Sequence, residues 1–227
     1  MSAPGQTANA PATPRMPVKR RLILIAFALG MLLAPAIVMV LVTWIGTGTP
    51  QAAATWASIP AIVGVAAAMA GGRRYAVIVA IVMGFLGPLS IVAGLSPVSG
   101  AALMALMCMT VGRLSRVGLQ TSGLLVPVML SWALIDPPTW DGALTVDRLD
   151  TEYLLWMALI FLVGGLVPAF LVSLLMRKRP APTPQSHSQS EATTYTVMIT
   201  VLVTAATFYV LANPRIIGGA FLIAVIL

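Results

Sequence analysis

The charged side chains that could bind a substrate or act as a gate lie at the edges of apolar segments rather than inside them. Asp136 directly follows the apolar stretch that ends Ser131-Trp132-Ala133-Leu134-Ile135. It opens the segment 136–152, which contains Arg148 and five of the six acidic residues of the chain. Asp136, Trp132 and Arg148 are therefore the candidates for a substrate pathway or a gate at the rim of a membrane bundle. A solvated carboxylate at a helix end is the alternative interpretation of Asp136.

Other reactive side chains stand alone. The single cysteine, Cys108, lies in an apolar run beside Met104, Met107 and Met109, where packing is a simpler explanation than copper ligation. The single histidine, His187, lies in a polar segment. The sequence contains no metal-ligand cluster, nucleotide-binding loop, dinucleotide fingerprint or nucleophile elbow. We therefore predict no catalytic residue, no metal and no cofactor, and we do not expect an enzyme.

The composition is that of an integral membrane protein. Hydrophobic residues make up 59% of the chain and charged residues 8%, whereas soluble domains carry about 25% charged residues. The formal net charge is +7, but the basic residues cluster between apolar runs, as in cytoplasmic loops of membrane proteins. They are not interleaved with aromatic residues, so we expect a lipid bilayer and not a nucleic acid as the partner.

Two long uncharged blocks set the number of membrane spans. Leu22 to Gly72 covers 51 residues and Tyr75 to Gly112 covers 38 residues without a charge. A helix needs ~20 residues to cross the hydrocarbon core, so each block holds two spans. The sequence predicts six spans, then one complete and one partial span, at 22–45, 54–70, 75–94, 98–112, 118–135, 153–176, 194–212 and 216–227.

The predicted fold is an all-α polytopic membrane helix bundle with four regions along the chain. These are a disordered basic cytoplasmic tail, a six-helix transmembrane bundle, a Pro/Ser/Gln-rich cytoplasmic linker and the start of a second transmembrane bundle. Their bounds are 1–21, 22–176, 177–193 and 194–227.

The distribution of basic residues predicts the orientation. With the N-terminus in the cytoplasm, eleven of the thirteen basic residues fall on the cytoplasmic side, and only Arg148 and Arg215 fall outside. The positive-inside rule therefore predicts a multi-pass protein of the inner (cytoplasmic) membrane with a cytoplasmic N-terminus.

Prolines recur inside the predicted spans, and ionisable residues do not. An internal proline removes one backbone donor and can kink its helix, which serves either packing or a binding site at the membrane midplane. The kink candidates are Pro35, Pro60, Pro88, Pro127 and Pro168. Because ion coupling usually needs an ionisable residue in the membrane, these helices alone do not look like a complete ion-coupled transporter.

Several hydrophobic segments resemble the fusaric acid resistance and aromatic-acid exporter family. They are the run 195–204, the run 218–227 after a turn, Trp56 at the start of a span, and the span end 131–138. The resemblance implies about six helices, a polar cytoplasmic segment and a second similar bundle. It also implies efflux of aromatic carboxylic acids or related small organic anions, driven by the proton gradient.

Three functions stay open from the sequence. The first is an exporter component whose substrate is a small organic acid. The second is a non-transporting membrane scaffold or partner subunit of an envelope complex, favoured by the uncharged spans. The third, a permease that relies on a separate ATPase, needs a cytoplasmic coupling helix, and the loops 71–74 and 113–117 are too short for one. We expect a homo-oligomer or a partner subunit.

Overall fold

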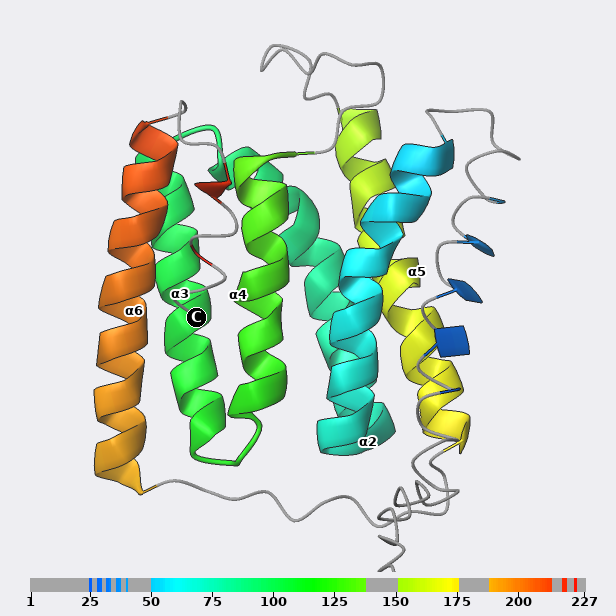
Figure 1. Ribbon diagram of the computed structural model, residues 1–227, viewed down its shortest axis with the longest axis horizontal. Coiled ribbons are helices and arrows are strands. Elements are labelled where there is room, and N and C mark those ends of the chain that lie inside the picture. Colours follow the sequence, from blue (N-terminus) through cyan, green and yellow to red (C-terminus); the bar gives the residue numbers. More distant parts are fainter. Residues whose placement is uncertain are drawn as a thin grey trace, which may run out of the picture.

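The described part of the chain is helical. A computed structural model describes residues 50–137, 151–175 and 188–213, together with single positions between 25 and 40 and at 218, 219 and 223. Within these residues there is no strand, which confirms the all-α prediction. The helices are α2 (Pro50–Ala93), α3 (Pro97–Ser115), α4 (Gln120–Ile135), α5 (Thr151–Leu175) and α6 (Gln189–Ala212) (Figure 1).

The number of candidate spans differs from the sequence prediction. Four of the described helices, α2, α3, α5 and α6, are long and apolar enough to cross a membrane. The described residues therefore do not support the predicted count of six. α4 has only 16 residues, which at 1.5 Å per residue is shorter than the hydrocarbon core. Two predicted spans, 54–70 and 75–94, fall within α2, and most of the span predicted at 22–45 lies outside the described residues.

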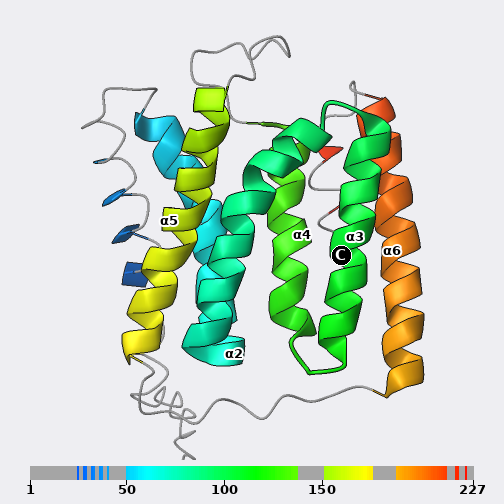
Figure 2. The same ribbon diagram turned by 180° about the vertical axis from the view of Figure 1, so that it is seen from behind.

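α2 consists of two helical arms joined at Gly72. The 44 residues of α2 include one with non-helical dihedrals, Gly72, at φ 73° and ψ −171°. A side chain is strained at such a positive φ, and glycine is not, so the chain can turn here between two helices. Residues 50–71 and 73–93 form the two arms, which run side by side in opposite directions (Figures 1 and 2).

The helices lie across the molecule in the order α6, α3, α4, α2 and α5 (Figure 1). α5 packs mainly against α2, α4 against α2 and α3, and α6 against α3. The division into a first bundle at 22–176 and the start of a second at 194–227 stays a prediction, and α6 itself packs directly on α3.

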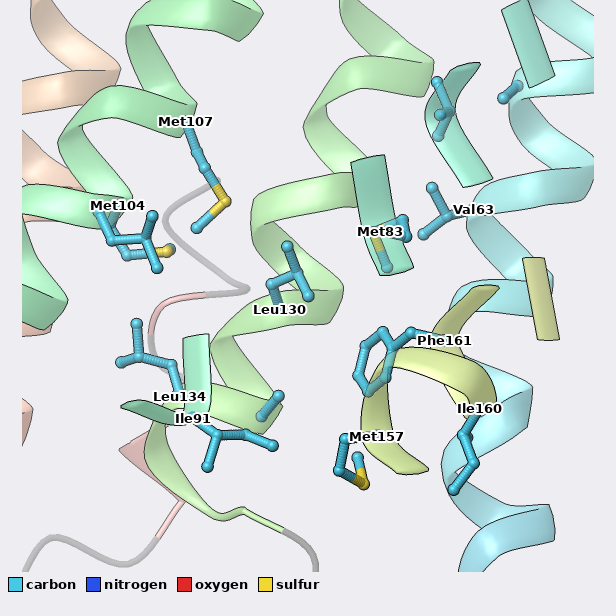
Figure 3. Close-up of a cluster of buried hydrophobic side chains, with 14 of the residues drawn as sticks. Val63, Met83, Ile91, Met104, Met107, Leu130, Leu134, Met157, Ile160 and Phe161 are labelled. Atoms are coloured by element: carbon cyan, nitrogen blue, oxygen red, sulfur yellow. The ribbon is translucent and has the colours of Figure 1, made fainter. Parts of the chain in front are cut away.

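Buried apolar side chains from all five described helices form the core. In Figure 3, Phe161 of α5 lies toward Met83 of α2, with Met157 of α5 on the other side of Phe161, while Met104 of α3 lies near Leu134 of α4. All five side chains are almost fully buried. Cys108 is also buried and free, and with Met104 and Met107 it belongs to this core.

Glycines allow α5 to approach the backbone of α2. A Cβ atom added to Gly64 would come within 2.3 Å of the carbonyl oxygen of Gly165. A Cβ on Gly165 would lie 3.2 Å from the Cβ of Ala80, on the second arm. In a membrane, where lipid is as apolar as the side chains, such close packing of small residues holds helices together.

α6 begins earlier than the sequence prediction. Ser188 accepts a hydrogen bond from the backbone N–H of Glu191, and the Glu191 carboxylate accepts one from the backbone N–H of Ser188. This capping box satisfies donors that are otherwise free in the first turn. The helix therefore starts at Gln189, five residues before the predicted span and inside the predicted linker.

Candidate functional site

Four arginines gather at one end of the bundle. The turn at Gly72, the α3–α4 turn, the C-terminal end of α5 and the N-terminal end of α6 all lie at this end (Figure 1). Arg73 and Arg74 follow Gly72, and Arg113 and Arg116 flank the end of α3. We call this the arginine end. Asp136 and Glu152 lie at the opposite end of α4 and α5 (Figure 1).

A pocket at the arginine end lies between the second arm of α2 and the last turns of α5. Its volume is about 370 Å³. Seven of its eight lining residues are uncharged, and the eighth is Arg73. We call it the Arg73 pocket, and its lining residues are Arg73, Val77, Leu166, Val167, Ala169, Phe170, Leu171 and Ser173.

The guanidinium of Arg73 is held against an aromatic ring. Its Cζ atom lies 5.2 Å from the centroid of the Phe170 ring, within the range in which a cation is attracted to the face of the ring. Among the described residues no carboxylate lies within ion-pair distance of Arg73. The hydroxyl of Ser173 donates to the carbonyl of Ala169 at 2.6 Å, so it is already satisfied. Arg73 thus supplies the free positive charge of an otherwise apolar pocket.

This combination suits an anion with an apolar body. A guanidinium is always charged and can hold a carboxylate through two parallel N–H donors. The apolar lining and the Phe170 ring favour the rest of such a ligand, an aromatic ring in particular. The volume lies at the small end of the ~300–1,000 Å³ range of small-molecule sites. Of the ligands considered in the sequence analysis, a small aromatic acid has the matching chemistry.

The residues predicted from the sequence lie elsewhere. Asp136 is the exposed residue at the C-terminal cap of α4, and its backbone N–H donates to the carbonyl of Trp132 at 2.9 Å. The Trp132 side chain, one turn earlier, is 44% exposed. Both lie at the end opposite Arg73, so the structure does not bring them to the Arg73 pocket. Arg148 lies outside the described residues. Their pathway role stays a prediction.

The proline candidates lie inside helices. Pro60 and Pro88 are in α2, Pro127 is in α4 and Pro168 is in α5. Gly72 is the residue of α2 with non-helical dihedrals, so the helix continues through Pro60 and Pro88. Pro35 lies outside the described residues. Pro127 lines a second pocket, described below, and the kinking role of the prolines stays a prediction.

Sequence reasoning missed two features. Arg73 and Arg74 were interpreted only as a topology signal, and no local pattern links Arg73 to Phe170 because they are on different helices. The second feature is a row of threonines in α6, at Thr200, Thr204 and Thr207, whose buried hydroxyls have no hydrogen-bond partner among the described residues. Their spacing of four and three positions places them on one side of the helix, and this spacing was readable in the sequence.

Within the described residues, no group of three or more His, Cys, Asp or Glu side chains comes together to hold a metal ion. In comparisons with protein-family models, with curated proteins and with solved structures, the chain matches none of them.

Proposed function

We propose that this multi-pass membrane protein is a component of an exporter for aromatic carboxylic acids or related small organic anions. The observation that supports the proposal is the Arg73 pocket, in which a guanidinium with no carboxylate partner among the described residues lies over the Phe170 ring. An exporter must take up its substrate on the cytoplasmic side. The pocket lies at the end that carries the arginines, which the positive-inside rule assigns to the cytoplasm.

The proposal includes the topology predicted from the sequence. The two arms of α2 would each cross the membrane, so that 22–45, these arms, α3, the predicted span 118–135 that contains α4, and α5 make six spans. The N-terminus would then be cytoplasmic, in the inner membrane. The 44-residue length of α2 supports two crossings, because a straight helix of this length would reach ~66 Å, about twice the hydrocarbon thickness.

Cysteine labelling in intact cells tests this topology. Single cysteines at Val117, Thr151 and Ser190, which are exposed, are introduced in a Cys108→Ala background and treated with a membrane-impermeant reagent. We expect labelling at position 151 only, because 117 and 190 lie at the arginine end (Figure 1). Labelling at 117 or 190 in sealed cells would contradict the proposed orientation.

Export is tested by loading cells with benzoate and following its loss, with and without this chain. We expect faster loss with the wild-type chain and with Arg74→Ala, and no acceleration with Arg73→Ala, since only Arg73 lines the pocket. Cyclohexanecarboxylate serves as the non-aromatic control of similar size. Equal loss of benzoate with and without the chain would argue against the exporter.

The scaffold function keeps one observation in its favour. In the described helices the charged side chains lie at helix ends and at the Gly72 turn, not in the middle of a span. A scaffold needs no ionisable residue in the membrane, whereas an ion-coupled carrier usually does. Co-purification of one stoichiometric membrane partner, without benzoate transport in isolated vesicles, would favour the scaffold.

A further inference from the structure

A second pocket lies on the other side of the second arm of α2. It is a groove of about 290 Å³ between this arm, α3 and α4. Its lining is apolar apart from Tyr75 and Thr110. We call it the α2–α3–α4 groove, and it is lined by Tyr75, Ile78, Val79, Val82, Leu86, Leu103, Leu106, Met107, Thr110, Val111, Leu114, Gly123, Val126 and Pro127.

The groove has a buried floor and exposed rims. Val79, Met107 and Val111 form part of the floor and are at most 7% exposed. Ile78 on one rim and Leu106 on the other are 58% and 60% exposed. Such rims are open to the surroundings of the bundle, which for a membrane helix is lipid. The groove is therefore an indentation in the lipid-facing surface.

The rims continue into arginines at one end. Arg74 is one helical turn before Ile78, and Arg113 is two turns after Leu106, so each lies on the same stripe of its helix as the rim residue. Both arginines are exposed, and neither has an ion-pair partner among the described residues. At this end the hydroxyls of Tyr75 and Ser122 also lie 3.4 Å apart. An apolar groove thus ends between two free positive charges.

The length of the groove corresponds to one leaflet. Leu86 lies eleven positions after Tyr75 on the same arm, which at 1.5 Å per residue is ~16 Å. This is about half of the ~30 Å hydrocarbon core. A ligand that fills the groove therefore has an apolar chain of about one leaflet's depth and a negative group at the arginine end.

We propose that the α2–α3–α4 groove is a binding site for one anionic phospholipid, with an acyl chain along the groove and the phosphate between Arg74 and Arg113. Anionic lipids are attracted to basic residues near the membrane surface, and Arg is well suited to phosphate oxygens. The site is separate from the Arg73 pocket and does not depend on the proposed export function.

Native mass spectrometry of the full chain in detergent tests the proposal. Phosphatidylglycerol and phosphatidylcholine with identical acyl chains are added separately, and retained lipids are counted. We expect one phosphatidylglycerol to be retained at lower concentration than phosphatidylcholine. Removing each arginine should weaken phosphatidylglycerol binding about fivefold, and Arg74→Ala with Arg113→Ala together about 25-fold. The double lysine variant should restore most of the preference.

Matched variants separate this site from other sources of binding. Arg73→Ala removes an arginine of the same end that lines the Arg73 pocket instead of continuing a rim of the groove, and it should leave the lipid preference unchanged. Thr110→Trp, which fills the groove from an exposed position, should weaken binding of both lipids. Free glycerol phosphate should not compete.

Four results would overturn the proposal. The first is equal retention of the two lipids by the wild type, and the second is a loss of phosphatidylglycerol binding in Arg73→Ala as large as in Arg74→Ala or Arg113→Ala. The third is competition by glycerol phosphate, and the fourth is a dimer that Thr110→Trp disperses. The last result would assign the groove to a second copy of the chain.

Discussion

The two pockets at the arginine end share one helical arm and differ in where its positive charge lies. In the Arg73 pocket the guanidinium is part of the lining and is held at 5.2 Å from the Phe170 ring. In the α2–α3–α4 groove the lining carries no charge, and Arg74 and Arg113 continue its rims. The first arrangement suits a small anion bound directly at the guanidinium, and the second suits a long apolar chain whose charge stays at the membrane surface.

Helical geometry explains why residues that are close together on the second arm of α2 face different pockets. Tyr75 follows Arg73 by two positions, which is about 200° of rotation on a helix. Arg73 and Val77 therefore face α5, while Tyr75, Val79 and Val82 face α3 and α4. The turn at Gly72 starts the arm, and so it sets which arginine falls on which side.

The largest expected effect comes from Gly64→Ala, which should disturb the Arg73 pocket and spare the groove. The new Cβ would lie 2.3 Å from the carbonyl oxygen of Gly165, and a backbone atom cannot move aside alone. α5 would have to shift, at a cost of about 1–3 kcal/mol for overpacking. The unfolding temperature in detergent and the affinity for benzoate should both decline, while retention of phosphatidylglycerol persists.

Gly123→Ala is the matched control on the groove side. Its Cβ would lie 2.8 Å from Leu114 Cδ1, the end of a flexible side chain. We expect little loss of stability because this side chain can change its rotamer. If Gly64→Ala and Gly123→Ala lowered the unfolding temperature equally, backbone contact between α2 and α5 would not be what distinguishes the two pockets.

The next largest effect is expected for Arg73→Ala on benzoate binding. A charged hydrogen bond contributes about 1.5–3 kcal/mol, so affinity should fall about 10- to 150-fold. Arg74→Ala should change it less than twofold, because Arg74 does not line this pocket. Isothermal titration calorimetry on purified protein measures both. Comparable losses would indicate a general charge effect instead of a defined site.

Phe170→Leu should have a smaller and more selective effect. It keeps an apolar side chain but removes the ring over which Arg73 lies, an interaction of about 0.5–2 kcal/mol. We expect benzoate affinity to fall about fivefold and its advantage over cyclohexanecarboxylate to decrease. Competition binding with the two acids measures this advantage, and an unchanged ratio would exclude the ring from recognition.

Ser188→Ala should leave both pockets unaffected. It removes the capping-box hydroxyl of α6, and α6 contributes no lining residue to either pocket. Loss of an N-cap costs about 1 kcal/mol, which thermal unfolding should detect. Benzoate binding and lipid retention should match the wild type, and a change in either would connect α6 to the pockets.

Local sequence patterns were enough to predict where most of the described helices lie. The length of an uncharged apolar run is a local property, so the predicted spans at 98–112, 118–135 and 153–176 coincide closely with α3, α4 and α5. The start of α6 was also readable locally, because Ser188 and Glu191 have capping-box spacing. The apolar run alone predicts a later start, at 194, because hydropathy carries no capping signal.

Which side chains meet depends on how the helices pack in three dimensions. Arg73 approaches Phe170 because the two arms of α2 pack against α5, with glycines 64 and 165 in close contact. The groove likewise needs three helices side by side. Hydrophobicity specifies that a segment enters the membrane, but lipid is equally apolar on every side. Which helix faces which therefore depends on close packing between segments that are distant in the chain.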